Sequence, residues 1–187
     1  AGETLVVHGA AGGVGLTAVA IGKLLQARVI ATANGQAKLQ VARANGADHL
    51  IDTSVEDVRL RIKELTGGHG ADVVYDPVGG DLFTASLRSM AFEGRILVIG
   101  FAGGGVPQIP ANHLLVKNVD VIGVNWPAYA EMHPQVMSAS FRRLLQWVVD
   151  GAIKPHVSAT YPLARAVEAL NQVLSRKSTG KVLIVMN

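Results

Sequence analysis

The sequence predicts an α/β fold with a doubly wound parallel sheet, and three observations support this class. Short apolar segments alternate with segments of helical length, as they do in a chain of β-α-β units. The apolar segments are continuous rather than interrupted by polar residues, which is typical of strands covered on both faces. A glycine-rich turn directly follows the first apolar segment and opens the first helical one. Six strands are expected, at 5–7, 28–32, 48–51, 72–76, 95–99 and 119–124.

Helices are expected between these strands, at 14–25, 36–45, 55–65 and 82–90. Glycine marks the end of two of them, because Gly46 follows the second and Gly67 follows the third. A loop rich in glycine and proline follows the fifth strand, over 100–110. Six strands in this arrangement fit two mononucleotide-binding halves, which predicts the strand order 3-2-1-4-5-6.

A further helix is expected after the sixth strand, because apolar residues recur there at helical spacing. Its apolar stripe consists of Met137, Phe141, Leu144, Leu145 and Val148. Gly151 ends this helix and Pro155 prevents it from continuing. The tail then holds a short extended piece, a helix over 163–174 and a last strand at 182–185. This C-terminal β-α-β tail is small for a domain of its own.

The composition excludes several classes of protein. The chain has 187 residues, 49% of them hydrophobic and 17% charged, so it can form a core and is not disordered. It contains no cysteine, which excludes disulfides, thiolate zinc sites and iron–sulfur clusters in this chain. No apolar run approaches ~18 residues, so no membrane span is expected. The net charge is only +3, its basic residues are scattered and aromatics are 5%, so nucleic-acid binding is not expected.

The first residues, Ala1-Gly2-Glu3-Thr4, include no initiator methionine and no secretory leader. We therefore expect a sequence cut from a longer chain and a cytoplasmic location.

The most informative motif is the glycine turn GAAGGVG at 9–15. In the G-x-G-x-x-G frame, Ala10 takes the first glycine position and is followed by Gly12 and Gly15. Such a turn lets the backbone approach a pyrophosphate and lets the helix pack closely on the strand. The N–H groups and dipole at the helix N-terminus stabilise the phosphate charge. Glycines also occur in turns that bind nothing, but the strand before this turn and the helix after it favour dinucleotide binding.

The end of the second strand favours NADPH over NADH. An NAD site requires Asp or Glu about 20 residues after the glycines, where the carboxylate accepts hydrogen bonds from the ribose hydroxyls. The stretch 31–38 contains no acid, and the nearest one is Asp48. A carboxylate would repel a 2′-phosphate, whereas small polar residues together with Lys38 would receive it. The alternative is that Lys38 is a solvated helix residue without a ligand.

Other nucleotide-binding classes fit less well. The missing acid also weakens the case for an S-adenosylmethionine methyltransferase. A short-chain dehydrogenase requires Tyr-x-x-x-Lys, but the residue four positions after each of the three tyrosines is glycine, histidine or arginine. The phosphate-binding motif G-x-x-x-x-G-K-[ST] is absent.

No residue is convincing as a catalytic acid, base or nucleophile. His8 is either functional or, as we favour, a packed or capping histidine, and Asp76 before Pro77 is expected to cap a turn. The histidines have no metal-ligand spacing, so no metal site is expected, and G-x-S-x-G is absent. The catalytic residues are left unassigned. This pattern agrees with hydride transfer, in which the cofactor carries the chemistry.

Several longer segments are more specific when they are taken together. The chain contains the run GETLVVHGAAGGVGLTAVAIGKLLQARVIATA, followed by NGADHLID, VVYDPVGG, GRILVIGFAGG, LLVKNVDVIGVNW and STGKVLIV. Over essentially the whole chain, these segments resemble the medium-chain dehydrogenase/reductases. They are most similar to the zinc-free, zeta-crystallin-like branch of NADPH:quinone oxidoreductases. The resemblance implies NADPH-dependent hydride transfer to quinones or other α,β-unsaturated carbonyls.

The resemblance also implies a set of cofactor-binding residues at the carboxyl ends of the strands. The pyrophosphate would be held by Ala11, Gly12, Gly13 and Val14. The adenosine phosphate end would meet Asn34 and Lys38. Thr53 stands near the adenine ribose, where family members often carry a tyrosine. The rest of the cofactor would be lined by Val78, Gly79, Gly100, Phe101, Ala102, Asn125 and Trp126.

The architecture that the resemblance implies has two domains. Residues 1–153 would form the NADP-binding Rossmann domain. Residues 154–187 would return to a substrate domain whose N-terminal part is absent from this sequence. The resemblance further implies a homodimer through 119–124, which would cover an apolar edge strand.

Two functions remain open at this point. The first is the nucleotide-binding portion of a quinone oxidoreductase, which by itself would turn over poorly. The second is a freestanding NADPH-binding or sensing module without catalysis. The reading frame upstream of Ala1 would distinguish them.

Overall fold

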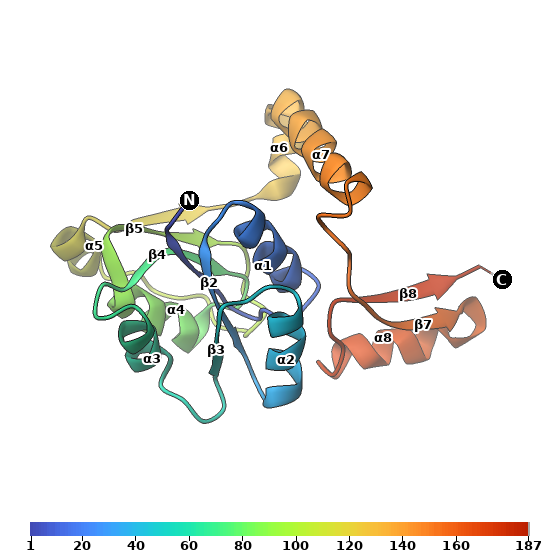
Figure 1. The fold of residues 1–187 in the computed structure, drawn as a ribbon, viewed down its shortest axis with the longest axis horizontal. Helices are drawn as coiled ribbons and strands as arrows, with labels where there is room; N and C mark the ends of the chain where they lie inside the picture. The colour runs from blue at the N-terminus through green and yellow to red at the C-terminus, as the bar shows by residue number, and fades with distance from the viewer. Residues whose placement is uncertain (187) are drawn as a thin grey trace.

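The fold is the predicted α/β class, in a computed structural model that describes residues 1–186. Six parallel strands form one sheet in the order β3-β2-β1-β4-β5-β6, as expected (Figure 1). The strands are β1 (Thr4–Val7), β2 (Arg28–Ala33), β3 (His49–Asp52), β4 (Ala71–Asp76), β5 (Met90–Val98) and β6 (Asp120–Gly123). The strand order reverses between β1 and β4. A ligand site is expected at this switch point, outside the carboxyl ends of the strands.

Helices cover both faces of this sheet because successive side chains of a strand point to opposite faces. The helices are α1 (Gly15–Leu24), α2 (Gln36–Ala44), α3 (Val58–Leu65), α4 (Gly80–Ser89) and α5 (Ala111–Lys117). Val7 and Val29 point to one face and form a buried cluster with Val19 of α1. Their neighbours Val6 and Ile30 point to the other face.

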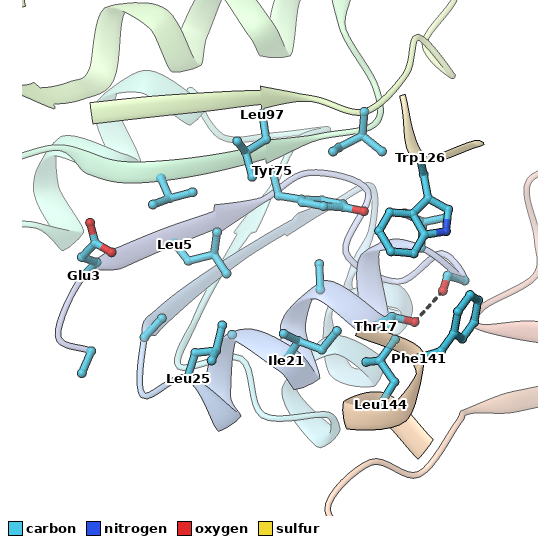
Figure 2. Close-up of a pocket in the computed structure, with 18 of the residues that line it drawn as sticks. Glu3, Leu5, Thr17, Ile21, Leu25, Tyr75, Leu97, Trp126, Phe141 and Leu144 are labelled. Carbon is cyan, nitrogen blue, oxygen red and sulfur yellow. Dashed lines mark hydrogen bonds between the residues drawn. The ribbon is translucent and has the colours of Figure 1, made fainter. Parts of the chain in front are cut away.

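The face that carries α1 and α2 is only partly covered. Beyond α1, Tyr75 of β4 and Leu97 of β5 face an apolar cavity of about 810 Å³. Figure 2 shows these two side chains opposite Ile21 of α1, with Trp126 and Phe141 at one end.

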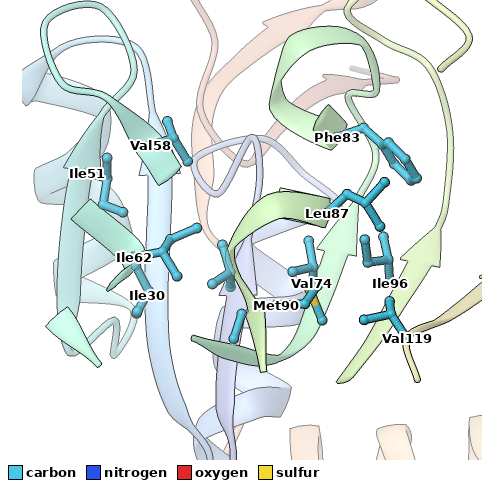
Figure 3. Close-up of a cluster of buried hydrophobic side chains, with 12 residues drawn as sticks. Ile30, Ile51, Val58, Ile62, Val74, Phe83, Leu87, Met90, Ile96 and Val119 are labelled. Carbon is cyan, nitrogen blue, oxygen red and sulfur yellow. The ribbon is translucent and has the colours of Figure 1, made fainter. Parts of the chain in front are cut away.

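The opposite face holds the larger core, between the sheet and helices α3 and α4 (Figure 3). Ile62 of α3 and Phe83 of α4 are almost completely buried there, against strand residues such as Val74 and Ile96. Full burial of a side chain of this size stabilises the fold by about 1.5–3 kcal/mol. This core holds the strands in register, so that their carboxyl ends meet at one edge.

Some boundaries differ from the prediction. Helix α3 begins at Val58 rather than at 55, because the Asp57 side chain accepts the N–H of Leu60 at 2.9 Å and caps the helix there. Strand β5 begins at Met90 rather than at 95, and its pairing with β4 shifts register between Ala71 and Val73. The apolar pattern did not predict α5 and the later helix α6, which are both only seven residues long.

After β6 the chain continues through two helices into a small second sheet. This part of the chain comprises α6 (Trp126–Met132), α7 (Pro134–Val149), β7 (Val157–Pro162), a 3-10 turn (Leu163–Arg165), α8 (Ala166–Leu174) and β8 (Lys181–Val185). Strands β7 and β8 pair in parallel, so the tail is β-α-β as predicted. It contacts the main body at the glycine turn, where the N–H of Gly180 donates to the Ala11 carbonyl at 2.8 Å.

Over residues 1–186, none of the helices combines the length and the hydrophobicity that crossing a bilayer requires.

Candidate functional site

The site begins at the glycine turn between β1 and α1. The turn is closed by the N–H of Gly12, which donates to the carbonyl of Gly9 at 2.9 Å. Gly9 itself has a φ of +58°, a conformation that favours glycine. A Cβ on Gly15 would lie 2.7 Å from the Cα of Ala10, so only glycine lets α1 start this close to the strand. Among residues 1–186, no side chain caps the start of α1. The N–H of Leu16 donates to the Gly12 carbonyl at 2.9 Å, and the positive end of the helix dipole favours an anion there.

The loop after β4 forms a second wall of the site. Asp76 is almost fully buried, and its Oδ1 accepts the N–H groups of Val78 at 2.8 Å and Gly79 at 2.9 Å. The expectation that Asp76 caps a turn is therefore confirmed. Gly79 has a φ of +73°, and a Cβ there would lie 2.8 Å from the carbonyl oxygen of Gly105. The carboxylate thus fixes the turn of this loop, and Val78 within it lies against Gly9 of the glycine turn.

A cavity of about 510 Å³ lies between these two walls. Eight of the predicted cofactor residues line it: Ala11, Gly12, Gly13, Asn34, Lys38, Thr53, Val78 and Ala102. They come from five separate stretches of sequence that converge at the carboxyl ends of the strands. The structure adds lining residues that the sequence did not assign to the cofactor: Gly9, Thr32 and Ala33 from the segments already noted, and Leu82, Gly103, Val173, Arg176, Ser178 and Gly180 from elsewhere.

The other predicted residues lie elsewhere along the same edge of the sheet. A second cavity, of about 760 Å³, is lined by Gly100, Phe101, Asn125 and Trp126 at the ends of β5 and β6. Val14 lines the apolar cavity of about 810 Å³ between α1 and the sheet. Trp126 borders both of these cavities, so they adjoin. Gly79 lines none of the three cavities and supports the loop from behind.

Arg176 is the main residue that sequence reasoning missed. It lies just after α8, and its guanidinium donates to the carbonyl of Ala102 at 3.0 Å. Its own carbonyl accepts a hydrogen bond from Lys38 Nζ at 2.8 Å. Lys38 and Arg176 both line the 510 Å³ cavity, and none of the described residues that line this cavity is acidic. The pair Arg176-Lys177 was visible in the sequence, but nothing local indicated that the tail folds back 138 residues to meet Lys38.

The nearest carboxylate on this side belongs to Asp52, at the end of β3. Its Oδ1 accepts hydrogen bonds from the Ser54 hydroxyl at 2.6 Å and from the N–H of Gly35 at 3.0 Å. These bonds, led by the one from Ser54, hold the pKa of Asp52 below its usual value. Asp52 thus orders the loops beside Asn34 and does not line the cavity.

His8, next to the turn, lies in the interior rather than in any of these cavities. It is fully buried, with hydrogen bonds to the hydroxyls of Thr32 and Ser86. Burial lowers the pKa of His8 to about 4, against the opposing effect of nearby Asp76, so the ring is neutral at pH 7. The packed interpretation of His8 is confirmed.

Within residues 1–186, no three or more His, Asp or Glu side chains gather closely enough to hold a metal ion.

A sheet of this order, with a glycine turn opening α1 and a cavity at the switch point, defines a Rossmann dinucleotide-binding protein. Residues 13–148 match the family described as zinc-binding dehydrogenase. The chain belongs to this family.

Known proteins resemble the chain over nearly its whole length. Quinone oxidoreductase-like protein 2 of Bos taurus is 42% identical over 184 residues, which are 98% of this chain and 53% of that protein. Its homolog in Nematostella vectensis is 40% identical, with 98% and 50% covered. The solved Escherichia coli quinone oxidoreductase complexed with NADPH has a TM-score of 0.87 and 33% identity, with 98% and 57% covered. The chain spans about half the length of the curated relatives it matches.

Proposed function

We propose that this chain is the NADPH-binding portion of an oxidoreductase that reduces quinones or other α,β-unsaturated carbonyls by hydride transfer. The observation that carries the proposal is the cavity beside the glycine turn, whose described lining includes the cationic residues Lys38 and Arg176 and no acidic residue. The relatives described as quinone oxidoreductases, one of them solved with NADPH, support the same activity.

The cofactor is proposed to lie along the carboxyl edge of the sheet. The N–H groups of Ala11, Gly13 and Val14 would bind the pyrophosphate at the start of α1, and Gly12, whose own N–H donates to Gly9, would let the ligand approach the backbone. Lys38 and Arg176 would hold the 2′-phosphate, with Asn34 and Thr53 beside them. The other end of the cofactor would extend along the loops that follow β4, β5 and β6, past Val78, Gly79, Gly100, Phe101, Ala102, Asn125 and Trp126.

The chain's own residues would bind and orient the reactants. When bound, the reduced nicotinamide supplies the hydride. The Asp76-capped loop would keep the cofactor against the sheet, and the apolar side chains around Trp126 would exclude water from the reacting end. A zinc-free reaction is part of the proposal, supported by the absence of cysteine from the sequence.

The division of the chain is also proposed. Residues 1–153 would form the cofactor domain and 154–187 would belong to a substrate domain, which agrees with the separate β7–β8 sheet. Since the chain spans about half of its relatives, we expect these 187 residues alone to bind NADPH and to reduce quinones slowly. A cytoplasmic location is part of the same proposal, because a dissociable, soluble cofactor must reach the site.

Titration with NADPH and NADH tests the proposed cofactor. Charge-assisted hydrogen bonds contribute about 1.5–3 kcal/mol each. Replacing Lys38 or Arg176 with alanine should therefore raise the Kd for NADPH about tenfold or more. The Kd for NADH, which lacks the 2′-phosphate, should change less than about twofold. Lys177→Ala is the matched control, because Lys177 is adjacent in sequence and does not line the cavity. Equal wild-type affinity for the two cofactors would contradict the proposal.

A homodimer through β6 is the proposed assembly. β6 is the last strand of the sheet, and the Ile122 side chain on it is 41% exposed. An apolar edge strand of this kind pairs readily with another chain. Ile122→Lys should shift the sedimentation equilibrium from twice the chain mass to the mass of one chain. Val55→Lys, on an exposed loop, should leave the dimer intact, and a wild-type monomer at all concentrations would rule this assembly out.

A further inference from the structure

His8 is a buried polar side chain for which the proposed function has no role. It follows β1 directly and precedes the glycine turn, and its own N–H donates to the carbonyl of Tyr75 at 3.1 Å. Its ring Nδ1 lies 2.8 Å from the Thr32 hydroxyl and its Nε2 lies 2.6 Å from the Ser86 hydroxyl. All three side chains are completely buried. A neutral imidazole has one N–H donor and one acceptor, so it can satisfy both hydroxyls at once.

The two hydroxyls belong to two different elements, β2 and α4, that each contribute residues to the 510 Å³ cavity. Thr32 lies near the end of β2 and lines the cavity, and its carbonyl accepts the N–H of Ala10 in the glycine turn at 3.0 Å. Ser86 lies on α4, whose first turn contributes Leu82 to the cavity. The His8 imidazole thus joins the end of β2 to α4. The glycine turn directly follows His8 in the sequence.

The same two hydroxyls depend on His8. Within residues 1–186, the imidazole is the side-chain partner of both the Thr32 and the Ser86 hydroxyl. An apolar residue at position 8 would leave two buried hydroxyls unpaired, and Thr32 would lose the contact that orients it beside the cavity. His8 itself lines none of the cavities, so it acts through these neighbours.

We propose that His8 is a positioning residue that sets the affinity of the site for the dinucleotide by holding β2 and α4 around the glycine turn. The inference rests on the proposed NADPH binding. It assigns His8 no contact with the cofactor and no proton transfer.

The experiment measures the Kd for NADPH and the melting temperature on the same variants of the 187-residue chain. His8→Leu should raise the Kd at least about tenfold. His8→Asn should also raise the Kd, because the Asn amide takes the place of Nδ1 and can bond to Thr32 but has no group in the place of Nε2, so β2 and α4 stay unjoined. His113→Leu is the matched control, because His113 lies on α5 and lines none of these cavities.

A triple variant separates positioning from stability alone. Combining His8→Leu with Thr32→Val and Ser86→Ala removes both unpaired hydroxyls, so the melting temperature should return toward wild type. The Kd should stay high, since nothing then joins β2 to α4.

Three results would overturn the inference: recovery of the Kd together with stability in the triple variant, an unchanged Kd in folded His8→Leu, or wild-type affinity in folded His8→Asn. If the wild-type chain itself does not bind NADPH, the proposed function fails instead.

Discussion

Acid should destabilise this protein between about pH 6.5 and pH 4, because of one buried histidine. His8 has an ordinary pKa of 6.5 in the unfolded chain, and burial lowers it to about 4 in the folded protein. Between these values the unfolded chain binds the proton and the folded protein does not. The free energy of unfolding therefore falls as the pH falls through this window, and the loss is complete below about pH 4.

The size of the effect follows from the same two pKa values. Each pH unit between them is worth about 1.4 kcal/mol, so the whole window corresponds to about 3 kcal/mol. A domain of this kind has a stability of about 5–15 kcal/mol, so this loss is readily measured. The pKa of the Asp52 carboxyl is held below its usual value by the Ser54 hydrogen bond, so its contribution is lost only at lower pH. Burial also lowers the pKa of His49, so His49 acts in the same direction above pH 4.5, and the comparison with a His8 variant separates the two histidines.

Urea unfolding followed by circular dichroism at pH 7.0, 6.0, 5.0 and 4.5 is the appropriate assay. The wild-type chain should lose most of the ~3 kcal/mol over this series. His8→Asn has no titrating group at this position and should lose much less, even though its stability at pH 7 is lower. His133→Asn, on the exposed start of α7, should behave like the wild type. Equal losses in the wild type and in His8→Asn would refute the argument that a buried neutral imidazole causes the acid sensitivity.

Two further predictions concern the loops of the site. Gly15→Ala should cost about 2–3 kcal/mol of stability, because the new Cβ would press on the backbone of the glycine turn. Gly123→Ala is the control: no atom lies within 4 Å of its Cβ, so stability should change by less than about 0.5 kcal/mol. Thermal unfolding of both variants checks this, and similar melting temperatures would contradict the steric argument. Asp76→Ala should cost about 2 kcal/mol and weaken NADPH binding, since it leaves two loop N–H groups without their acceptor. Asp81 is an exposed acid at the start of α4, and Asp81→Ala should leave both the stability and the Kd for NADPH unchanged. If the Asp76 and Asp81 variants behave alike, the cap at Asp76 does not hold the loop.

Much of the fold was predictable because it depends on local patterns. The continuous apolar segments and the glycine turn indicated all six strands and their order, and the structure has the same order. The apolar pattern predicted less well the elements whose bounds depend on pairing with a distant part of the chain. Met90 belongs to β5 only because the strand pairs back to Ala71 across a register shift, and sequence periodicity carries no record of that pairing.

In the candidate site, too, the parts that depend on a short stretch of chain were predictable. The glycine turn and the loops after the strands were found from sequence, because phosphate binding at a helix N-terminus requires particular residues at fixed spacing. Eight of the residues predicted in this way line one cavity. The proposal that they bind NADPH was formed from the sequence and still awaits the titration described above.

By itself, the sequence determined the class of fold, the position of the turn and the absence of an acid after β2, since each is a property of a short stretch of chain. Only the tertiary structure decided that Arg176 lies beside Lys38, and that His8 joins Thr32 to Ser86. Those contacts join residues 24 to 138 positions apart. They arise from packing of the sheet, α4 and the tail around the glycine turn, and no local pattern records which distant groups that packing brings together.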